Sequence, residues 1–177
     1  TNGIAGGSSQ TILRSSDRGH SWAVVQTGFF GGGFTGAHMA NNFDGMLVGE
    51  NSIFQPLSAH TTDAGLTWSF TAFYLNSNEG ASNDVYLFNE NLGVAVSQVW
   101  DGTGAISGTV DGGVNWTTTL VPEDLTGVDF PTLDFGWAVG SSGTIMKTTD
   151  NGLTWESQSS GVGETLREVS FSDSLEG

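Results

Sequence analysis

Four aspartates recur at one position of an eight-residue motif, Ser/Thr-x-Asp-x-Gly-x-x-Trp. They are Asp17, Asp63, Asp111 and Asp150, at intervals of 39 to 48 residues. Repeated carboxylates can act as catalytic acids or metal ligands, but the flanking residues favour a structural role. In a tight turn the carboxylate accepts backbone N–H groups, the glycine adopts a positive φ, and the tryptophan anchors the next strand. We therefore interpret these aspartates as turn residues.

Other chemistry has little support in the residue pattern. The histidines, His20, His38 and His60, are dispersed without the spacing of a metal site. The sequence has no cysteine, which excludes disulfides and thiol catalysis. We predict no catalytic residue, no metal ligand and no cofactor. Structural calcium held by unlike loops stays open as an alternative.

The recurring motif defines one supersecondary unit that is used four times. Short segments such as Val85-Tyr86-Leu87 and Val128-Asp129-Phe130 alternate with a period of two, which places their apolar residues on one face of a strand. The last unit is expected to contain strands at 137–140, 144–149 and 155–158, and an inner strand at 166–171. These features predict a single all-β domain of four-stranded antiparallel blades. Its four repeats span about 3–45, 46–93, 94–136 and 137–177.

The motif resembles the Asp box, or BNR repeat, of β-propellers such as sialidases, xyloglucanases and photosystem II stability/assembly factor-like proteins. The run from Gly136 to Trp155 is especially similar to the assembly factor-like proteins. The resemblance implies a β-propeller whose Asp boxes are structural turns opposite the ligand site. Two arrangements follow: a complete four-bladed ring, closed by pairing of the C-terminal inner strand with the N-terminal strands, or an arc of a larger propeller.

A binding site is expected where the repeats differ, because folding already explains the shared residues. In a propeller the loops between the second and third strands of a blade, and between successive blades, share the face opposite the Asp boxes. Aromatic rings beside polar groups in these loops suit sugar or peptide recognition, although the rings could instead cover blade edges. The predicted ligand-binding residues are Phe29, Phe30, Tyr74, Asn76, Trp100 and Asp101.

The charge of the chain argues against some classes of partner. Four basic residues against 19 acidic ones give a net charge of -15, which repels nucleic acid and anionic lipid. We expect no nucleic-acid binding and no membrane insertion, since no apolar run approaches the roughly 18 residues of a membrane helix. The glycine-rich composition suits a secreted, cell-surface or periplasmic/lumenal protein.

These observations predict a non-catalytic extracellular or lumenal binding or scaffold module that recognises a protein or glycan through its loop face. Self-association is expected if the ring is incomplete. The alternative is a fragment of an Asp-box glycoside hydrolase, xyloglucanase-like or sialidase-like. The residues favour the binding module, because Arg14, Arg18 and Arg167 do not form a sialidase-type arginine cluster. No unit offers a distinctive pair of acids for inverting hydrolysis.

Overall fold

The computed structural model describes residues 1–26, 31–75 and 80–172. In these ranges the chain forms fifteen strands and one short 3-10 turn, which confirms the all-β prediction. The elements are β1 Gly3–Gly7, β2 Thr11–Ser15, β3 Ala23–Gln26, β4 Gly33–Met39, β5 Gly45–Glu50, β6 Pro56–Thr61, β7 Ser69–Ala72, β8 Gly80–Leu87, β9 Gly93–Val99, β10 Gly104–Thr109, β11 Thr117–Val121, β12 Leu125–Asp129, β13 Gly136–Gly140, η1 Ser141–Gly143, β14 Ile145–Thr148 and β15 Glu156–Gln158.

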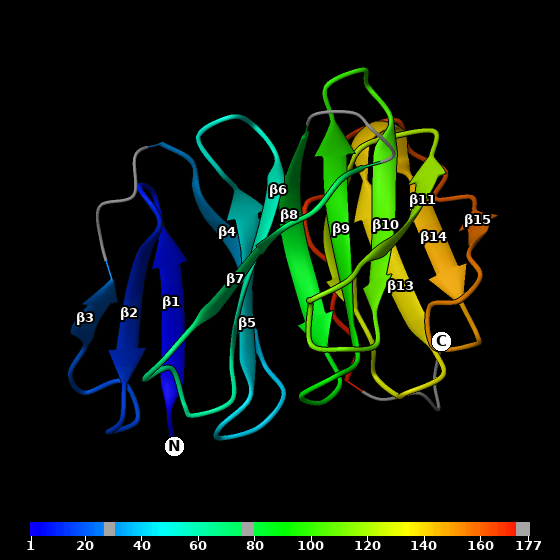
Figure 1. Ribbon diagram of the computed structural model, residues 1–177. Coiled ribbons are helices and arrows are strands. Elements are labelled where there is room, and N and C mark those ends of the chain that lie inside the picture. Colours follow the sequence, from blue (N-terminus) through cyan, green and yellow to red (C-terminus); the bar gives the residue numbers. More distant parts are fainter. Residues whose placement is uncertain (27–30, 76–79, 173–177) are drawn as a thin grey trace.

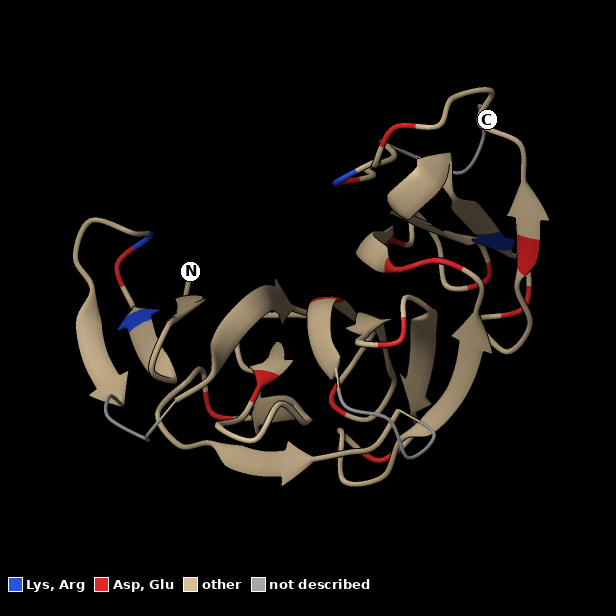
Figure 2. Ribbon diagram, turned by 90° about the horizontal axis from the view of Figure 1, so that it is seen from above, with Lys and Arg blue, Asp and Glu red and all other residues tan. Residues whose placement is uncertain are grey.

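The strands form four antiparallel sheets that follow one another along the chain (Figure 1). The first sheet has three strands, β1 to β3, and the others have four each: β4 to β7, β8 to β11 and β12 to β15. Seen from above, the sheets follow an open curve whose two ends do not meet (Figure 2). The described part of the chain is therefore an arc of blades.

Three inner strands, β4, β8 and β12, are connected by a repeated contact. Each contains a β-bulge near its start. The side chain at the bulge donates a hydrogen bond to a backbone carbonyl of the next inner strand: Thr35 donates to Ser82, and Asn83 donates to Leu125. Thr126 continues the series by donating to the carbonyl of Leu166, at 2.6 Å. The segment after Leu166 thus occupies the place of a further inner strand.

The prediction of a strand over 166–171 is nevertheless wrong. The segment contacts the fourth sheet, where the Phe171 N–H donates to Asp129 at 2.7 Å and the Phe171 ring lies 4.1 Å from the ring of Trp137. Within the described ranges it pairs with no strand. A strand needs a neighbour for its backbone groups, and β1, which would be that neighbour in a closed ring, lies at the other end of the curve (Figure 2).

The four motifs form the same turn, here called the motif turn: Ser15–Trp22, Thr61–Trp68, Thr109–Trp116 and Thr148–Trp155. In the fourth, the Asp150 carboxylate accepts hydrogen bonds from the backbone N–H and the hydroxyl of Thr154 at 2.8 and 2.6 Å. The indole N–H of Trp155 donates to the Gly152 carbonyl, and Gly152 has a φ of +81°. The other three motif aspartates accept the corresponding pair of hydrogen bonds from the backbone N–H and the side chain of Ser21, Thr67 and Asn115.

Removal of the threonine hydroxyl at the start of a motif turn is expected to destabilise the fold. Thr148 is 1% exposed, and its hydroxyl accepts from the Gly152 N–H at 3.0 Å and donates to Asp150 at 2.8 Å. Thr148→Val leaves the Gly152 N–H without this partner, so we expect a loss of about 1–3 kcal/mol in urea unfolding. The exposed neighbour Thr149 provides the matched control, and Thr149→Val should cost less than about 0.5 kcal/mol. Equal losses in both variants would contradict the role of the hydroxyl.

Candidate functional site

The loop face is formed by the turns after β5 and β9, at the top of Figure 1, whereas the motif turns lie at the opposite end of the strands. The turn after β5 is organised by Asn51, whose side-chain oxygen accepts from the N–H groups of Ile53 and Gln55, both at 3.0 Å. This turn directs two apolar side chains outward: Ile53 is 61% exposed and Phe54 is 53% exposed. Phe54 has a φ of +58°, an uncommon conformation for a bulky residue.

The turn after β9 contains Trp100 and Asp101. The Asp101 carboxylate accepts from the backbone N–H and the hydroxyl of Thr103, at 3.0 and 2.7 Å, and these bonds lower the pKa of Asp101. Trp100 is 50% exposed, and its ring lies edge-on to Phe54 with 6.3 Å between ring centroids. Ile53, Phe54 and Trp100 together form an exposed apolar surface, which we call the loop-face patch.

The structure describes three of the predicted ligand-binding residues, and they do not all lie in the same turn. Trp100 lies beside Phe54, which was not among the predicted residues although it lies in a turn where the repeats differ. Tyr74 is 67% exposed, but its carbonyl accepts a hydrogen bond from Thr118 in the outer strand β11. Tyr74 therefore lies over the outer part of the third sheet. The predicted residues Phe29, Phe30 and Asn76 lie outside the described residues, so their role stays a prediction.

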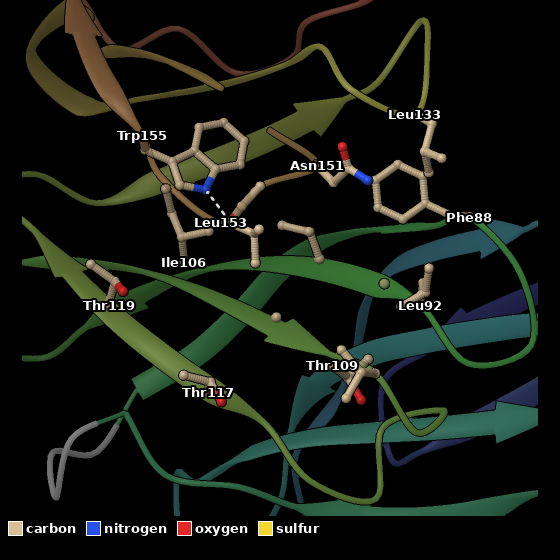
Figure 3. A pocket seen from close by; sticks show the side chains of 15 residues that line it. Phe88, Leu92, Ile106, Thr109, Thr117, Thr119, Leu133, Asn151, Leu153 and Trp155 are labelled. Atoms are coloured by element: carbon tan, nitrogen blue, oxygen red, sulfur yellow. Dashed lines mark hydrogen bonds between the residues drawn. The ribbon is translucent and has the colours of Figure 1, made fainter. Parts of the chain in front are cut away.

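Two cavities lie on the motif-turn side of the sheets. One, of about 330 Å³, lies between the third and fourth sheets and is lined mainly by apolar side chains, including Ile106, Leu153 and Trp155 (Figure 3). The other, of about 500 Å³, lies at the ends of the inner strands and shares Phe88 and Leu133 with the first. The described residues that line these cavities include no aspartate or glutamate.

The second cavity has a histidine that is held in one tautomer. The Leu87 N–H donates to Nδ1 of His38 at 3.0 Å, so the proton of the neutral imidazole lies on Nε2. Burial lowers the pKa of His38, and its ring stacks on Tyr86 at 4.4 Å. Among the residues whose placement is described, no group of three or more His, Asp or Glu side chains is arranged to hold a metal ion. Structural calcium therefore stays a prediction without an assigned site.

Two carboxyl groups at strand ends each have one buried oxygen atom that accepts no hydrogen bond from the described residues. These atoms are Oε2 of Glu50 and Oδ1 of Asp124. Burial raises the pKa of both groups. Glu50 ends β5 in the second sheet, and Asp124 precedes β12 in the fourth, so the two acids belong to different blades. Neither lines the two cavities described above.

The arrangement of sheets is that of a β-propeller, and comparisons with solved structures agree. The chain is similar to YCF48 from Cyanidioschyzon merolae, with a TM-score of 0.66 and 14% identity over 93% of this chain and 58% of that one. It is also similar to a structure of YCF48 bound to D1 peptide, with a TM-score of 0.53 and 16% identity over 88% of this chain and 76% of that one. No family model and no curated protein matches the sequence.

The described residues contain no helix long and apolar enough to span a membrane.

Proposed function

We propose that this chain is a non-catalytic β-propeller that binds a protein partner through the loop-face patch. The observation that carries the proposal is the exposed edge-on pair of Phe54 and Trp100, with Ile53 beside it. Neither aromatic ring is required by the blade pattern, because both belong to turns that differ between repeats. Exposed aromatic anchors that bury on association contribute much of the free energy of protein–protein binding.

The proposal includes a peptide segment as the partner and a secreted, cell-surface or periplasmic/lumenal location. A peptide partner is supported by the similar propeller YCF48, one structure of which has a bound D1 peptide. Self-association through the first sheet, whose last strand β3 exposes Val24 to 63%, stays part of the proposal.

A glycan partner is the second candidate, because Trp100 adjoins the polar side chain of Asp101. Sugar recognition needs polar groups that orient the hydroxyls beside the aromatic platform. The Asp101 carboxylate already accepts two hydrogen bonds from Thr103, which favours a peptide over a sugar at this patch. The hydrolase alternative requires two carboxyl groups facing one another across a cleft, and neither described cavity is lined by an acid.

The test first selects, from a random peptide-display library, the peptide that binds this chain most tightly. Trp100→Ala and Phe54→Ala should each weaken that peptide by more than about 1 kcal/mol, roughly fivefold in Kd, in calorimetric titration. Tyr74→Ala tests the third aromatic residue that the sequence predicted and the structure describes. A similar loss would extend the binding site from the patch to the outer part of the third sheet, where Tyr74 lies.

The matched control is Phe43→Ala. Phe43 is an exposed phenylalanine in the turn between β4 and β5, on the motif-turn side, and its removal should leave the affinity unchanged. Unchanged affinity in both Trp100→Ala and Phe54→Ala would overturn the assignment of the patch. Binding to members of a glycan array, with no selected peptide, would overturn the protein partner.

A further inference from the structure

The cavity between the third and fourth sheets coincides with a break in the repeat. The residue directly before the Ser or Thr of each motif turn is Arg14 in the first unit, His60 in the second and Lys147 in the fourth. All three are basic residues, and their side chains are long enough to reach the neighbouring sheet. The third unit has Gly108 at this position instead.

Two of these side chains contact the next motif turn along the chain. Nε of Arg14 donates to the backbone carbonyl of Ala64 at 2.6 Å, which connects the first sheet to the second. The His60 ring lies against Gly112, since a Cβ placed on Gly112 would be 2.9 Å from Cε1 of His60. Burial lowers the pKa of His60, so His60 fills the space as a neutral ring, whereas Arg14 adds a hydrogen bond from a charged group.

The corresponding contact is missing at the third unit. A Cβ placed on Gly108 would meet no atom within 4 Å, and Gly108 lines the 330 Å³ cavity. Asn151 lies on the opposite wall, at the position in its motif turn that Ala64 and Gly112 have in theirs (Figure 3). The cavity is therefore the space that a side chain at position 108 would fill.

We propose that this cavity receives an arginine side chain of a partner polypeptide. The guanidinium would donate to the backbone carbonyl of Asn151, as Arg14 does to that of Ala64. The aliphatic part of the side chain would lie on Ile106 and Trp155, an arrangement that arginine adopts readily on apolar surfaces.

The surrounding charges favour a cationic occupant. None of the described lining residues is charged, but Asp111, Asp134 and Asp150 each directly adjoin one of them in the sequence. Hydrogen bonds lower the pKa of Asp111 and Asp150, which keeps both carboxylates ionised at neutral pH. With a net charge of -15, the chain as a whole also attracts a basic partner. This site lies on the face opposite the loop-face patch, so it is independent of the function proposed above.

The test uses three acetylated, amidated pentapeptides, Gly-Ser-X-Ser-Gly, in which X is arginine, citrulline or norleucine. Citrulline has nearly the shape of arginine without its charge, and norleucine has only an aliphatic chain. In NMR titrations of the ¹⁵N-labelled chain at low salt, the arginine peptide should shift the amide signals of Gly108 and Asn151. It should bind at least tenfold more tightly than either of the other peptides.

Two substitutions at one position separate filling of the cavity from other effects. Gly108→Arg should abolish binding, because it supplies the missing side chain within the chain itself. Gly108→Ala should retain binding, since its Cβ meets open space. If Gly108→Arg does not fold, Gly108→His replaces it, with His60 as the precedent. Trp100→Ala should leave the affinity for the arginine peptide unchanged.

Four results would overturn the proposal. They are equal affinity for the citrulline peptide, equal or tighter binding of the norleucine peptide, retained binding in the folded variant with a filled cavity, and signal shifts confined to Phe54 and Trp100.

Discussion

Phe130→Ala is expected to lower the free energy of unfolding by about 3–5 kcal/mol. Phe130 is 2% exposed, and its ring lies 4.7 Å from Phe88 and 5.8 Å from Trp155. It belongs to the largest apolar cluster, which includes Val94 and other residues of the third sheet as well as residues of the fourth. Truncation to alanine removes these contacts and leaves a void that the surrounding strands fill only in part.

Phe43→Ala provides the matched control, because it makes the same chemical change at a side chain that is 62% exposed. The control should change stability by no more than about 0.5 kcal/mol. Urea unfolding followed by tryptophan fluorescence measures both variants. A loss in Phe130→Ala within about 1 kcal/mol of that in Phe43→Ala would contradict close packing of the third sheet against the fourth.

The second large effect is the loss of the stability that protonated Asp84 contributes as the pH rises from about 4 to 7. Burial raises the pKa of Asp84 from 3.8 to about 6, although its carboxylate accepts hydrogen bonds from the N–H groups of Val128 and Val85. The negative charges of Glu168 and Asp129 act in the same direction. Between these two pKa values the folded state binds more protons than the unfolded state. Stability is therefore lost as Asp84 ionises, by up to about 3 kcal/mol.

Urea unfolding of the parent chain and of Asp84→Asn between pH 4 and 7 tests this prediction. Relative to the variant, the parent should lose up to about 3 kcal/mol of stability as the pH rises. The other groups with shifted pKa values in this range, such as Glu50 and His38, contribute to both proteins and cancel in this difference. An equal slope in both proteins would show that another group titrates.

Below about pH 4 the motif turns act in the opposite direction. Hydrogen bonds lower the pKa of Asp17 and Asp63 to about 2. The stability that these two aspartates contribute is therefore present above pH 3.8 and is lost as the pH falls toward 2. Asp84→Asn should retain this acid-induced loss.

Features that depend on residues close in sequence could be predicted from the sequence. A motif turn is complete within eight residues, because Asp150 bonds to Thr154 and Thr148 bonds to Gly152. The alternation of apolar residues in segments such as 85–87 predicted strands for the same local reason, since successive side chains of a strand point to opposite faces. These signals led to the all-β architecture of repeated antiparallel sheets, which the structure confirms.

The candidate site could be predicted only in part, because it depends on which turns become neighbours. The sequence indicated the turn that contains Trp100, but its contact with Phe54 joins two turns from different sheets. The sequence contains one indication of the cavity at Gly108, because a glycine stands where the other three units have a basic residue. The meaning of that indication depends on Asn151, which lies opposite only after the sheets have packed.

The sequence by itself determined the turns, the strand periodicity and the repeated unit, because short-range hydrogen bonds and side-chain alternation specify them. The tertiary structure determined which segments pair with a neighbouring strand. The segment 166–171 has the alternation of a strand, yet it forms none because β1 lies at the other end of the curve. Asp84 looks like an ordinary acid in the sequence, and it is chiefly its burial between inner strands, which no local pattern shows, that raises its pKa. Burial and long-range pairing arise when distant parts of the chain meet, so no local pattern records them.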